Sequence, residues 1–415
     1  MKTPKSLRLQ IGLFGRTNVG KSSFLNLVAG QDVAITSPVP GTTTDVVEKA
    51  MELLPLGPVV FLDTAGIDDT SVLAELRLKK TRKIFDRSDV IVLMLEPDAW
   101  GAYEDEIAAE AKKRETPVIL VVNKTDLKRP SPEFLKNLEK ISCRLIQCSS
   151  LDLAGRDASI NPLKKHLLDV CPDSFLNPPP LLGDLVPSGG LAVFIVPIDL
   201  QAPKGRLILP QVQAIRETLD NDSAVMVVKE REYPALLARL NAPPDLVVCD
   251  SQVVLKMTAD TPPSVKCTTF SVLFSRFKGD LNEAARGAAA IDSLKAQDRV
   301  LIAEACSHHA IEDDIGRVKI PRWLRQYCGC DLAVDVCAGR DYPENLGEYK
   351  LVIHCGGCML TRREMLHRIG KCREMKVPIT NYGVCVSALQ GVIRRTLSPF
   401  PAALDAFLTF SARRS

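Results

Sequence analysis

Residues 15–22 read Gly15-Arg16-Thr17-Asn18-Val19-Gly20-Lys21-Ser22, which matches the pattern G-x-x-x-x-G-K-[ST] in full. Apolar residues at 7–14 predict a β-strand before this stretch, and residues 23–29 predict a helix after it. The glycines let the backbone wrap an anion, so that loop N–H groups and the helix N-terminus point at phosphate. Lys21 then reaches the β- and γ-phosphates, and Ser22 binds magnesium. We therefore predict a P-loop nucleotide-binding domain of the α/β class.

Three further motifs follow in the order that a GTPase needs. Residues 59–62 lead into Asp63-Thr64-Ala65-Gly66, where a carboxylate at a strand end can hold magnesium through water. Residues 118–122 lead into Asn123-Lys124-Thr125-Asp126, which resembles the guanine-specificity motif of translation-factor-like GTPases. On that resemblance Asp126 accepts hydrogen bonds from the guanine edge, and Ser149-Ser150 matches the last guanine-contacting loop. The ordered set predicts binding of GTP and GDP with Mg²⁺.

Residues 40–45 resemble the Gly-Thr-Thr-x-Asp switch of TrmE-like GTPases, and on that match Thr43 senses magnesium and the γ-phosphate. Ile67 stands where the Ras-type enzyme has a water-orienting glutamine, so no side chain there can position the nucleophile. Asn18 matches the position that binds potassium in potassium-activated TrmE-like GTPases, where K⁺ stands in for an arginine finger. We expect slow basal hydrolysis of GTP that potassium stimulates. Arg16 is an alternative local finger, although such a residue is more often solvated.

These matches define one set of predicted site residues. The predicted catalytic residues are Lys21, Thr43, Asp63 and Gly66. The predicted nucleotide-contacting residues are Gly15, Asn18, Val19, Gly20, Lys21, Ser22, Ser23, Asn123, Lys124, Asp126, Ser149 and Ser150. Ser22 and Thr43 are the predicted magnesium ligands, and Asn18 is the predicted potassium ligand.

A second set of residues indicates a metal site far along the chain. Cys306 and His308 follow the apolar run 300–303, and His354-Cys355-Gly356-Gly357-Cys358 follows the run 351–353 about 45 residues later. Short apolar runs bounded by polar residues predict buried parallel strands, and ligands bind beyond the carboxyl ends of such strands. If both runs lie in one sheet, Cys306, Cys355 and Cys358 converge at one edge. These three are the predicted ligands, with His308 and His354 as further candidates.

The residues alone leave the identity of the metal open. Soft thiolates on a tight Cys-x-x-Cys turn select zinc or an iron–sulfur cluster. Zinc requires a closed tetrahedral set, such as three cysteines and one histidine. An iron–sulfur cluster usually takes four thiolates, so three would leave one iron with a weaker or exchangeable ligand. The plainer interpretation is that Cys306 is a core thiol. Cys328 and Cys330 form a rival pair, which we interpret as thiols at a helix end because no histidine or glycine-rich turn supports them.

Composition excludes several classes of protein. The chain has 415 residues, 46% of them hydrophobic and 25% charged, which is typical of a globular protein with two or three domains. A net charge of +3 falls short of the basic surface of a nucleic-acid binder. No signal peptide is evident, and no apolar run is long enough to cross a bilayer. The 13 cysteines then favour free thiols and metal ligands over disulfides, and hence a reducing cytoplasm.

Changes in composition predict three domains. Residues 1–172 form the GTPase domain, which a Pro- and Gly-rich linker at 177–190 follows. Residues 185–272 alternate strand and helix patterns without a catalytic constellation, so we interpret them as a connecting or self-association module. Residues 273–415 alternate helices with short strands and predict a parallel, doubly wound sheet. The predicted fold is a three-domain α/β chain.

In this order of domains the whole chain resembles the FeFe-hydrogenase maturation GTPases of the HydF family. The specific signature is Cys306-x-His308 followed by His354-Cys355-x-x-Cys358, since many families share the GTPase motifs. The resemblance implies a 4Fe-4S cluster that Cys306, Cys355 and Cys358 hold, with a labile fourth ligand. It also implies a scaffold or carrier that receives a two-iron precursor, made with the radical-SAM maturases HydE and HydG, and delivers it to apo FeFe-hydrogenase. The middle module resembles the family's dimerisation domain, which implies a homo-oligomer, either dimer or tetramer.

Two other functions share part of these features. A TrmE- or Era-like GTPase in tRNA modification or ribosome assembly shares the N-terminal half, but it would carry a basic RNA-binding domain, and the sequence has no such segment. A regulatory GTPase with a structural zinc domain would use His308 or His354 as the fourth ligand. Metal analysis separates zinc from an iron–sulfur cluster.

Overall fold

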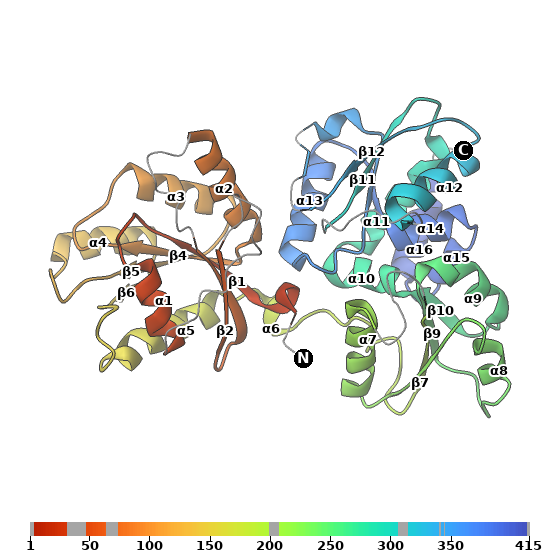
Figure 1. Cartoon of the computed structure of the whole chain (residues 1–415), viewed down its shortest axis with the longest axis horizontal. Helices are drawn as coiled ribbons and strands as arrows, with labels where there is room; N and C mark the ends of the chain where they lie inside the picture. Colours follow the sequence, from red (N-terminus) through yellow and green to blue (C-terminus); the bar gives the residue numbers. More distant parts are fainter. Residues whose placement is uncertain are drawn as a thin grey trace. The chain divides into compact units, whose positions relative to one another are not determined.

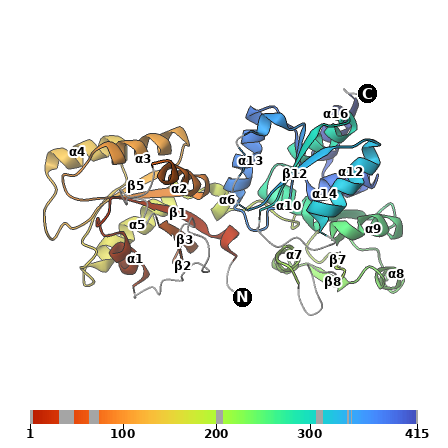
Figure 2. The same ribbon diagram turned by 45° about the horizontal axis from the view of Figure 1, so that its top comes forward.

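The computed structural model of the chain describes residues 4–30, 47–63, 74–198, 207–305, 314–339, 342–343 and 345–412. Contacts divide the chain into two compact units, Met1–Pro178 and Pro179–Ser415 (Figure 1, Figure 2). The first unit holds a sheet of six strands, and the second holds two sheets of four strands each. None of the helices within the described ranges is long and apolar enough to cross a membrane.

The first unit is built on a mostly parallel sheet in the order β2-β3-β1-β4-β5-β6, in which β2 alone runs antiparallel to its neighbour. Its strands are β1 (Leu9–Phe14), β2 (Val47–Leu53), β3 (Gly57–Asp63), β4 (Val90–Leu95), β5 (Val118–Val122) and β6 (Leu145–Gln147). Its α-helices are α1 (Lys21–Ala29), α2 (Ala74–Arg87), α3 (Ala102–Lys113), α4 (Pro132–Ile141), α5 (Arg156–Val170) and α6 (Asp173–Leu176). The strands predicted before the nucleotide motifs are all present, with ends within two residues of the prediction.

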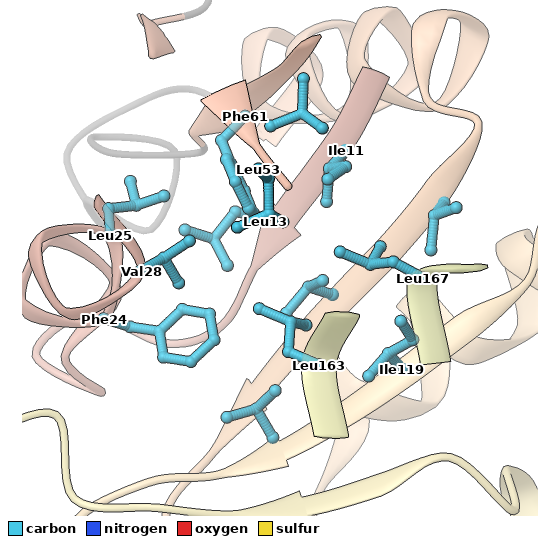
Figure 3. Close-up of a cluster of buried hydrophobic side chains, with 14 of the residues drawn as sticks. Ile11, Leu13, Phe24, Leu25, Val28, Leu53, Phe61, Ile119, Leu163 and Leu167 are labelled. Atoms are coloured by element: carbon cyan, nitrogen blue, oxygen red, sulfur yellow. The ribbon is translucent and has the colours of Figure 1, made fainter. Parts of the chain in front are cut away.

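Side chains alternate between the two faces of this sheet, as they must in a strand. On one face, Ile11 of β1 packs in a cluster with Phe24 of α1 and Leu163 of α5 (Figure 3). On the other face, Phe14 packs in a cluster with Phe85 of α2 and with side chains of α3 and α4. Strands β1 and β4 are buried along their whole length. Burial on both faces explains why β4 is a continuous apolar run in the sequence and why β1 contains a single polar residue, Gln10.

The second unit begins with a parallel sheet in the order β10-β9-β7-β8. Its strands are β7 (Leu191–Ile195), β8 (Ala224–Val228), β9 (Leu246–Cys249) and β10 (Lys266–Thr269). The helices α7 (Leu209–Asp220), α8 (Tyr233–Leu237), α9 (Val254–Asp260) and α10 (Phe270–Lys278) alternate with them. Strand β8 lies at an edge of the sheet, and there Met226 is 39% and Val227 is 43% exposed. An apolar edge strand is a surface suited to pairing with another chain.

The other sheet of this unit is also parallel and has the order β12-β11-β13-β14. Its strands are β11 (Arg299–Ala303), β12 (Ala333–Cys337), β13 (Leu351–His354) and β14 (Ile379–Asn381). Its helices are α11 (Leu281–Ala289), α12 (Ile320–Cys328), α13 (Arg362–Glu374), α14 (Tyr382–Leu389), α15 (Ile393–Thr396) and α16 (Pro401–Ala412). Met365 of α13 packs against one face, beside Leu301, while Leu324 of α12 packs against the other, beside Ile302. The parallel sheet predicted for this region is confirmed.

The two sheets of the second unit share their hydrophobic cores. Phe194 of β7 and Phe270 of α10 lie in one cluster with Ala285 of α11. Val193 of β7 lies in another cluster with Ile302 of β11. The boundary predicted between residues 272 and 273 falls within α10, whose residues contribute to the shared core. The three domain boundaries stay a prediction, and the contacts describe one compact unit from Pro179 onward.

Some predicted elements differ from the observed ones. The apolar segment 268–273 is divided, because the Thr269 hydroxyl accepts the N–H of Val272 and so caps a helix that begins at Phe270. The Ala-rich pattern of residues 281–296 predicts a single helix, but the observed helix ends at Ala289 and a short 3-10 turn follows it. The pattern of residues 384–394 also predicts a single helix, which is interrupted near Gly391, where φ is 72°. Helix α16 has no counterpart in the sequence predictions.

Candidate functional site

The P-loop begins where β1 ends and closes onto the first turn of α1. Gly15, Asn18 and Gly20 all have positive φ, at 149°, 64° and 97°. A Cβ at Gly20 would collide with the amide of Asn123, and a Cβ at Gly15 would lie 2.8 Å from the carbonyl oxygen of Met94. Asparagine is one of the few residues with a side chain that tolerate a positive φ. The backbone geometry of the loop therefore explains its residue types.

Lys21 folds back over this loop. Its Nζ donates hydrogen bonds to the carbonyl oxygens of Gly15 at 2.5 Å and of Arg16 at 3.0 Å. The residue is 9% exposed, although lysine is almost never buried without partners. The carbonyl oxygens thus hold the ammonium group at the loop, where the sequence predicts contact with nucleotide phosphates.

The predicted magnesium-binding side chains of the described residues lie at the same edge of the sheet. Ser22 is exposed at the start of α1, and Ser23 beside it is half-buried. Asp63 is the last residue of β3, is 3% exposed and pairs in register with Leu13 of β1, two residues before the P-loop. The serine thus lies in the first turn of the helix after the loop, and the carboxylate lies at the end of the strand beside β1. Their role as magnesium-binding groups stays a prediction. Thr43, and Gly66 with it, lie outside the described residues.

Asn123 joins three of the nucleotide motifs. Its Nδ2 donates to the carbonyl of Val19 in the P-loop at 2.8 Å. Its Oδ1 accepts from the backbone N–H of Ser150 at 2.9 Å and from the Ser150 hydroxyl at 2.8 Å. The residue is 2% exposed, so each lost partner would leave a buried polar group unsatisfied, at about 1–3 kcal/mol. The Asn123 side chain thus links the P-loop, the guanine-specificity motif and the Ser149-Ser150 loop.

The rest of the guanine-specificity motif lies nearer to solvent. Lys124 has a φ of 60°, and its Nζ forms an ion pair with Glu96 at 2.5 Å. Asp126 is exposed, and Ser149 is half-buried in the adjoining loop. The backbone N–H of Thr125 donates to the carbonyl of Cys148 at 3.2 Å, which links this motif to the loop after β6. The carboxylate of Asp126 is therefore accessible to a base.

Arg16 is held by an ion pair that the sequence analysis did not predict. Its guanidinium makes two hydrogen bonds to the Glu104 carboxylate, Nε to Oε1 at 2.8 Å and Nη2 to Oε2 at 2.5 Å. The Glu104 side chain is 2% exposed, and this pairing raises the pKa of Arg16. Tyr103 lies next in sequence, and its hydroxyl accepts the N–H of Gly15 at 3.3 Å. The start of α3 therefore braces the P-loop. The Arg16 side chain is 51% exposed, in line with a solvated residue, but its guanidinium is held by Glu104 and is not free to act as a finger in this arrangement. A separation of 88 residues leaves no local pattern that could reveal the pair.

The strands that precede the predicted cysteine ligands are neighbours in one sheet. Ala303 at the end of β11 pairs in register with His354 at the end of β13, and the Cys355 N–H donates to the Ala303 carbonyl at 2.9 Å. The N–H of Ala305 donates to the Sγ of Cys355 at 3.1 Å. Ala305 directly precedes Cys306, which lies outside the described residues, as does His308. The residue that precedes Cys306 in the sequence is therefore hydrogen-bonded to the Cys355 sulfur.

The turn that carries Cys355 and Cys358 is compact. Gly357 has a φ of 61°, and its carbonyl accepts the N–H of Leu360 at 2.9 Å. Both cysteines are half-buried. Helix α13 starts directly after the turn, with Thr361 as its N-cap. Two half-buried thiols on one turn are a suitable pair of soft ligands.

A buried lysine holds this turn, and the sequence analysis did not single it out. Lys278, the last residue of α10, is 1% exposed. Its Nζ donates to the carbonyl oxygens of Gly357 at 3.3 Å, Cys358 at 2.8 Å and Leu360 at 2.8 Å. Burial lowers the pKa of Lys278 to about 8, while the nearby Cys358 thiol and a carboxylate oppose that shift. A lone lysine before a glycine gives no sequence signal for this role.

His354 is engaged in two hydrogen bonds and is therefore a poor candidate for a metal ligand. Its Nε2 lies 2.8 Å from Nη1 of Arg368, which can only donate, and its Nδ1 lies 2.7 Å from the carbonyl of Cys355. The residue is 1% exposed, and burial together with Arg368 lowers the pKa of His354 to about 3. The neutral imidazole thus has no nitrogen lone pair to offer. This arrangement argues against the sequence-based candidacy of His354.

A small cavity of about 20 Å³ adjoins Cys355, between α10, α11 and the ends of β13 and β14. Phe274, Ile379 and Thr380 contribute to its lining. The hydroxyl of Thr380 is buried without a hydrogen-bond partner among the described residues. A cavity of this size holds a single water-sized group.

Five other cysteines lie in the region of the second four-stranded sheet, and two of them, Cys328 and Cys330, lie at a helix end as the sequence predicts. Cys328 ends α12 and Cys330 follows it, and both contact a hydrophobic cluster. Cys372 and Cys385 are fully buried in clusters, with their pKa raised by burial, and Cys337 is half-buried. Among the described residues no three metal-binding side chains converge, which accords with a third predicted thiolate that lies outside them.

Comparison with known families gives three matches along the chain. Residues 10–124 match the 50S ribosome-binding GTPase domain. Residues 181–279 match the hydrogen maturase F dimerization domain, and residues 282–399 match the hydrogen maturase F tetramerization domain. The GTPase match supports binding of GTP and GDP with Mg²⁺ and hydrolysis of GTP. The other two matches support homo-oligomerisation.

Curated relatives resemble the GTPase domain only. The tRNA modification GTPase MnmE of Synechococcus sp. (strain JA-3-3Ab) is 44% identical over 120 residues, which are 29% of this chain and 26% of that protein. MnmE of Clostridioides difficile (strain 630) is 38% identical over 151 residues, which are 35% of this chain and 32% of that protein. The matched region thus spans about a third or less of the length of these relatives.

Two solved structures show a weak likeness to part of the chain. Era of Aquifex aeolicus bound to GDP and AlF4⁻ has 21% identity and a TM-score of 0.32, covering 56% of this chain and 98% of that one. The G domain of the T. maritima FeoB iron transporter has 18% identity and a TM-score of 0.32, covering 40% of this chain and 99% of that one.

The three matches follow one another along the chain, a GTPase domain and then two oligomerisation domains of one family. The sequence analysis expected the dimerisation domain and interpreted the last region by its cysteines as the part that carries the cluster, not as a second oligomerisation domain. The two maturase domains together cover more than half of the chain. The chain belongs to the hydrogen maturase F (HydF) family of GTPases.

Proposed function

We propose that this protein is a GTP-hydrolysing scaffold that binds a 4Fe-4S cluster and assembles or delivers the two-iron subcluster precursor to apo FeFe-hydrogenase. The observation that carries the proposal is the hydrogen bond from the Ala305 N–H to the Cys355 sulfur. It fixes the residue before Cys306 beside one of the two cysteines of the Cys-x-x-Cys turn. Three thiolates are thereby expected at one sheet edge, in a protein of the hydrogen maturase F family.

The described residues fit a thiolate-bound cluster. Cys355 and Cys358 are half-buried and next to each other on one turn, and Cys306 would complete a set of three. His354 is engaged elsewhere, so a zinc site of three cysteines and this histidine is disfavoured. A cluster with three protein thiolates keeps one iron for an exchangeable ligand, which is the chemistry that attachment of a precursor needs.

The nucleotide site is proposed to act as a switch. Lys21, Ser22 and Asp63 would hold the phosphates and Mg²⁺, while Thr43 and Gly66 would respond to the γ-phosphate. Ordering of such loops by nucleotide changes the surface that a partner meets. The proposed partners are HydE and HydG, which supply the precursor, and apo FeFe-hydrogenase, which receives it. Whether the oligomer is a dimer or a tetramer stays a prediction, and the exposed apolar edge of β8 suits a second copy of the chain.

Potassium is expected to stimulate hydrolysis through Asn18. Replacing sodium with potassium should raise kcat for GTP by roughly 10-fold or more, because an ion beside the phosphates stabilises charge in the transition state. The Asn18→Gly variant should lose the stimulation, since glycine accepts the φ of 64° without strain but offers no amide oxygen. Thr17→Ala, at the exposed neighbouring residue, is the matched control. Equal rates in the two salts would contradict the assignment.

Metal analysis tests the proposed function. Protein purified without oxygen should contain about four irons and four sulfides per chain, with an EPR signal after reduction. Loaded with the precursor, it should activate apo-hydrogenase. Stoichiometric zinc without sulfide would reject the cluster and favour the alternative, a TrmE- or Era-like GTPase with a structural zinc domain.

A further inference from the structure

Within the described ranges, Lys278 is a buried cation to which no carboxylate is hydrogen-bonded. Among the described residues it forms no ion pair, and its three N–H donors are all used by the carbonyl oxygens of Gly357, Cys358 and Leu360. Its Nζ also lies 5.7 Å from the centroid of the Phe274 ring. The Glu364 carboxylate acts on Lys278 electrostatically, but its hydrogen bonds go to Thr361, with which it caps helix α13. Burial of an ammonium group is costly unless negative charge lies nearby.

The negative charge that fits this position is the pair of thiolates. The carbonyl of Cys358 itself accepts from Lys278, and both Cys355 and Cys358 act on the lysine electrostatically. Metal binding requires both thiols to be deprotonated. The lysine would then compensate part of the charge of a thiolate-bound cluster from its buried side.

Lys278 reaches the cysteine turn from a different part of the fold. It ends α10, inside the region that matches the dimerization domain, whereas the turn lies in the region that matches the tetramerization domain. A second cation links the same two parts of the fold. Arg362 is the first residue of α13, and its Nη1 donates to the carbonyls of Arg276, Phe277 and Gly279 at the end of α10. One junction therefore contains two cations, of which Lys278 alone contacts the cysteine turn.

We propose that Lys278 is a positioning residue of the metal site, which holds the Cys355–Cys358 turn in its ligating form and supplies a buried positive charge to the thiolate-bound metal. The proposal rests on the proposed function in that the expected metal is the iron–sulfur cluster. It assigns to the last helix of the dimerization region a direct part in metal binding. Loss of a residue that does not bind the metal but holds its ligands in place typically lowers metal affinity by about 10- to 100-fold.

The test uses the full chain and three variants: Lys278→Met, Lys278→Arg and Arg362→Met. Release of metal to an excess of chelator should be about 10-fold or more faster in Lys278→Met than in the wild type. Arg362→Met is the matched control, because it removes a half-buried cation whose hydrogen bonds among the described residues go to carbonyls at the end of α10 and not to the cysteine turn. It should release metal at close to the wild-type rate. Lys278→Arg keeps the charge and should recover most of the retention.

The midpoint potential of the bound cluster distinguishes charge from mere packing. Loss of a buried positive charge disfavours the more negative, reduced form, so Lys278→Met should shift the potential to more negative values and Lys278→Arg should not. Equal release rates and potentials in Lys278→Met and wild type would overturn the proposal, as would equal effects of Lys278→Met and Arg362→Met. If the wild type holds zinc instead, the proposed function fails, and the zinc release rate alone decides the role of Lys278.

Discussion

Replacing Cys355 with serine is expected to abolish iron and sulfide binding and the ability to activate apo-hydrogenase, while kcat for GTP stays within about twofold of the wild type. A serine oxygen is a hard and poorly ionised ligand that does not replace a thiolate toward iron. The substitution also replaces the sulfur that accepts the Ala305 N–H, next to Cys306 in the sequence. The GTPase motifs lie in the other compact unit of the chain, so their own hydrogen bonds are untouched.

The control for this variant is Cys330→Ser, at a half-buried thiol that contacts a hydrophobic cluster. It should keep about four irons per chain. The measurements are iron and sulfide content, EPR of the reduced protein and GTP turnover on the same preparations. Loss of GTP hydrolysis together with iron would indicate a general folding defect, and full retention of iron in Cys355→Ser would remove this cysteine from the ligand set.

Replacing Lys21 with alanine is expected to have the converse effect. Hydrolysis of GTP should fall by roughly 100-fold or more, because an aimed cation that stabilises phosphate charge is lost. The carbonyls of Gly15 and Arg16 would also lose their shared donor, which loosens the P-loop. Iron and sulfide content should stay at the wild-type level, since the carbonyls that accept from Lys21, those of Gly15 and Arg16, belong to the first unit and the cysteine turn belongs to the second.

The natural control is Lys124→Ala, whose ammonium pairs with Glu96 at the rim of the site. This variant should mainly weaken nucleotide binding and hence raise the KM for GTP. Turnover and nucleotide affinity separate the two lysines, and iron analysis accompanies both. An unchanged turnover in Lys21→Ala would contradict the P-loop assignment.

Activation of hydrogenase by the Lys21→Ala protein then reports what nucleotide turnover contributes. If GTP acts as a switch for partner association, activation should fall although the cluster is intact. Activation at the wild-type level would place the role of GTP outside delivery. The two variants together thus separate the chemistry of the metal site from that of the nucleotide site.

Much of the nucleotide site could be predicted from sequence, because the P-loop and the guanine-specificity motif are contiguous stretches at strand ends. Gly20 is an example, since its positive φ and its contact with Asn123 both require a glycine at that point of the pattern. The brace of Arg16 by Glu104 could not be predicted, because 88 residues separate the two and only the packing of α3 beside β1 brings them together. The same holds for the several partners of Asn123.

The sequence by itself determined the order of the domains, the P-loop, the parallel character of the sheets and the cysteine spacing. These properties follow from local patterns: glycines at strained backbone positions, continuous apolar runs and a Cys-x-x-Cys turn. Only the tertiary structure decided that Lys278 donates hydrogen bonds to that turn and that Arg368 donates one to Nε2 of His354. The reason is that a buried polar side chain loses its water and must form hydrogen bonds within the protein instead. The groups that accept or donate these bonds come from distant parts of the chain.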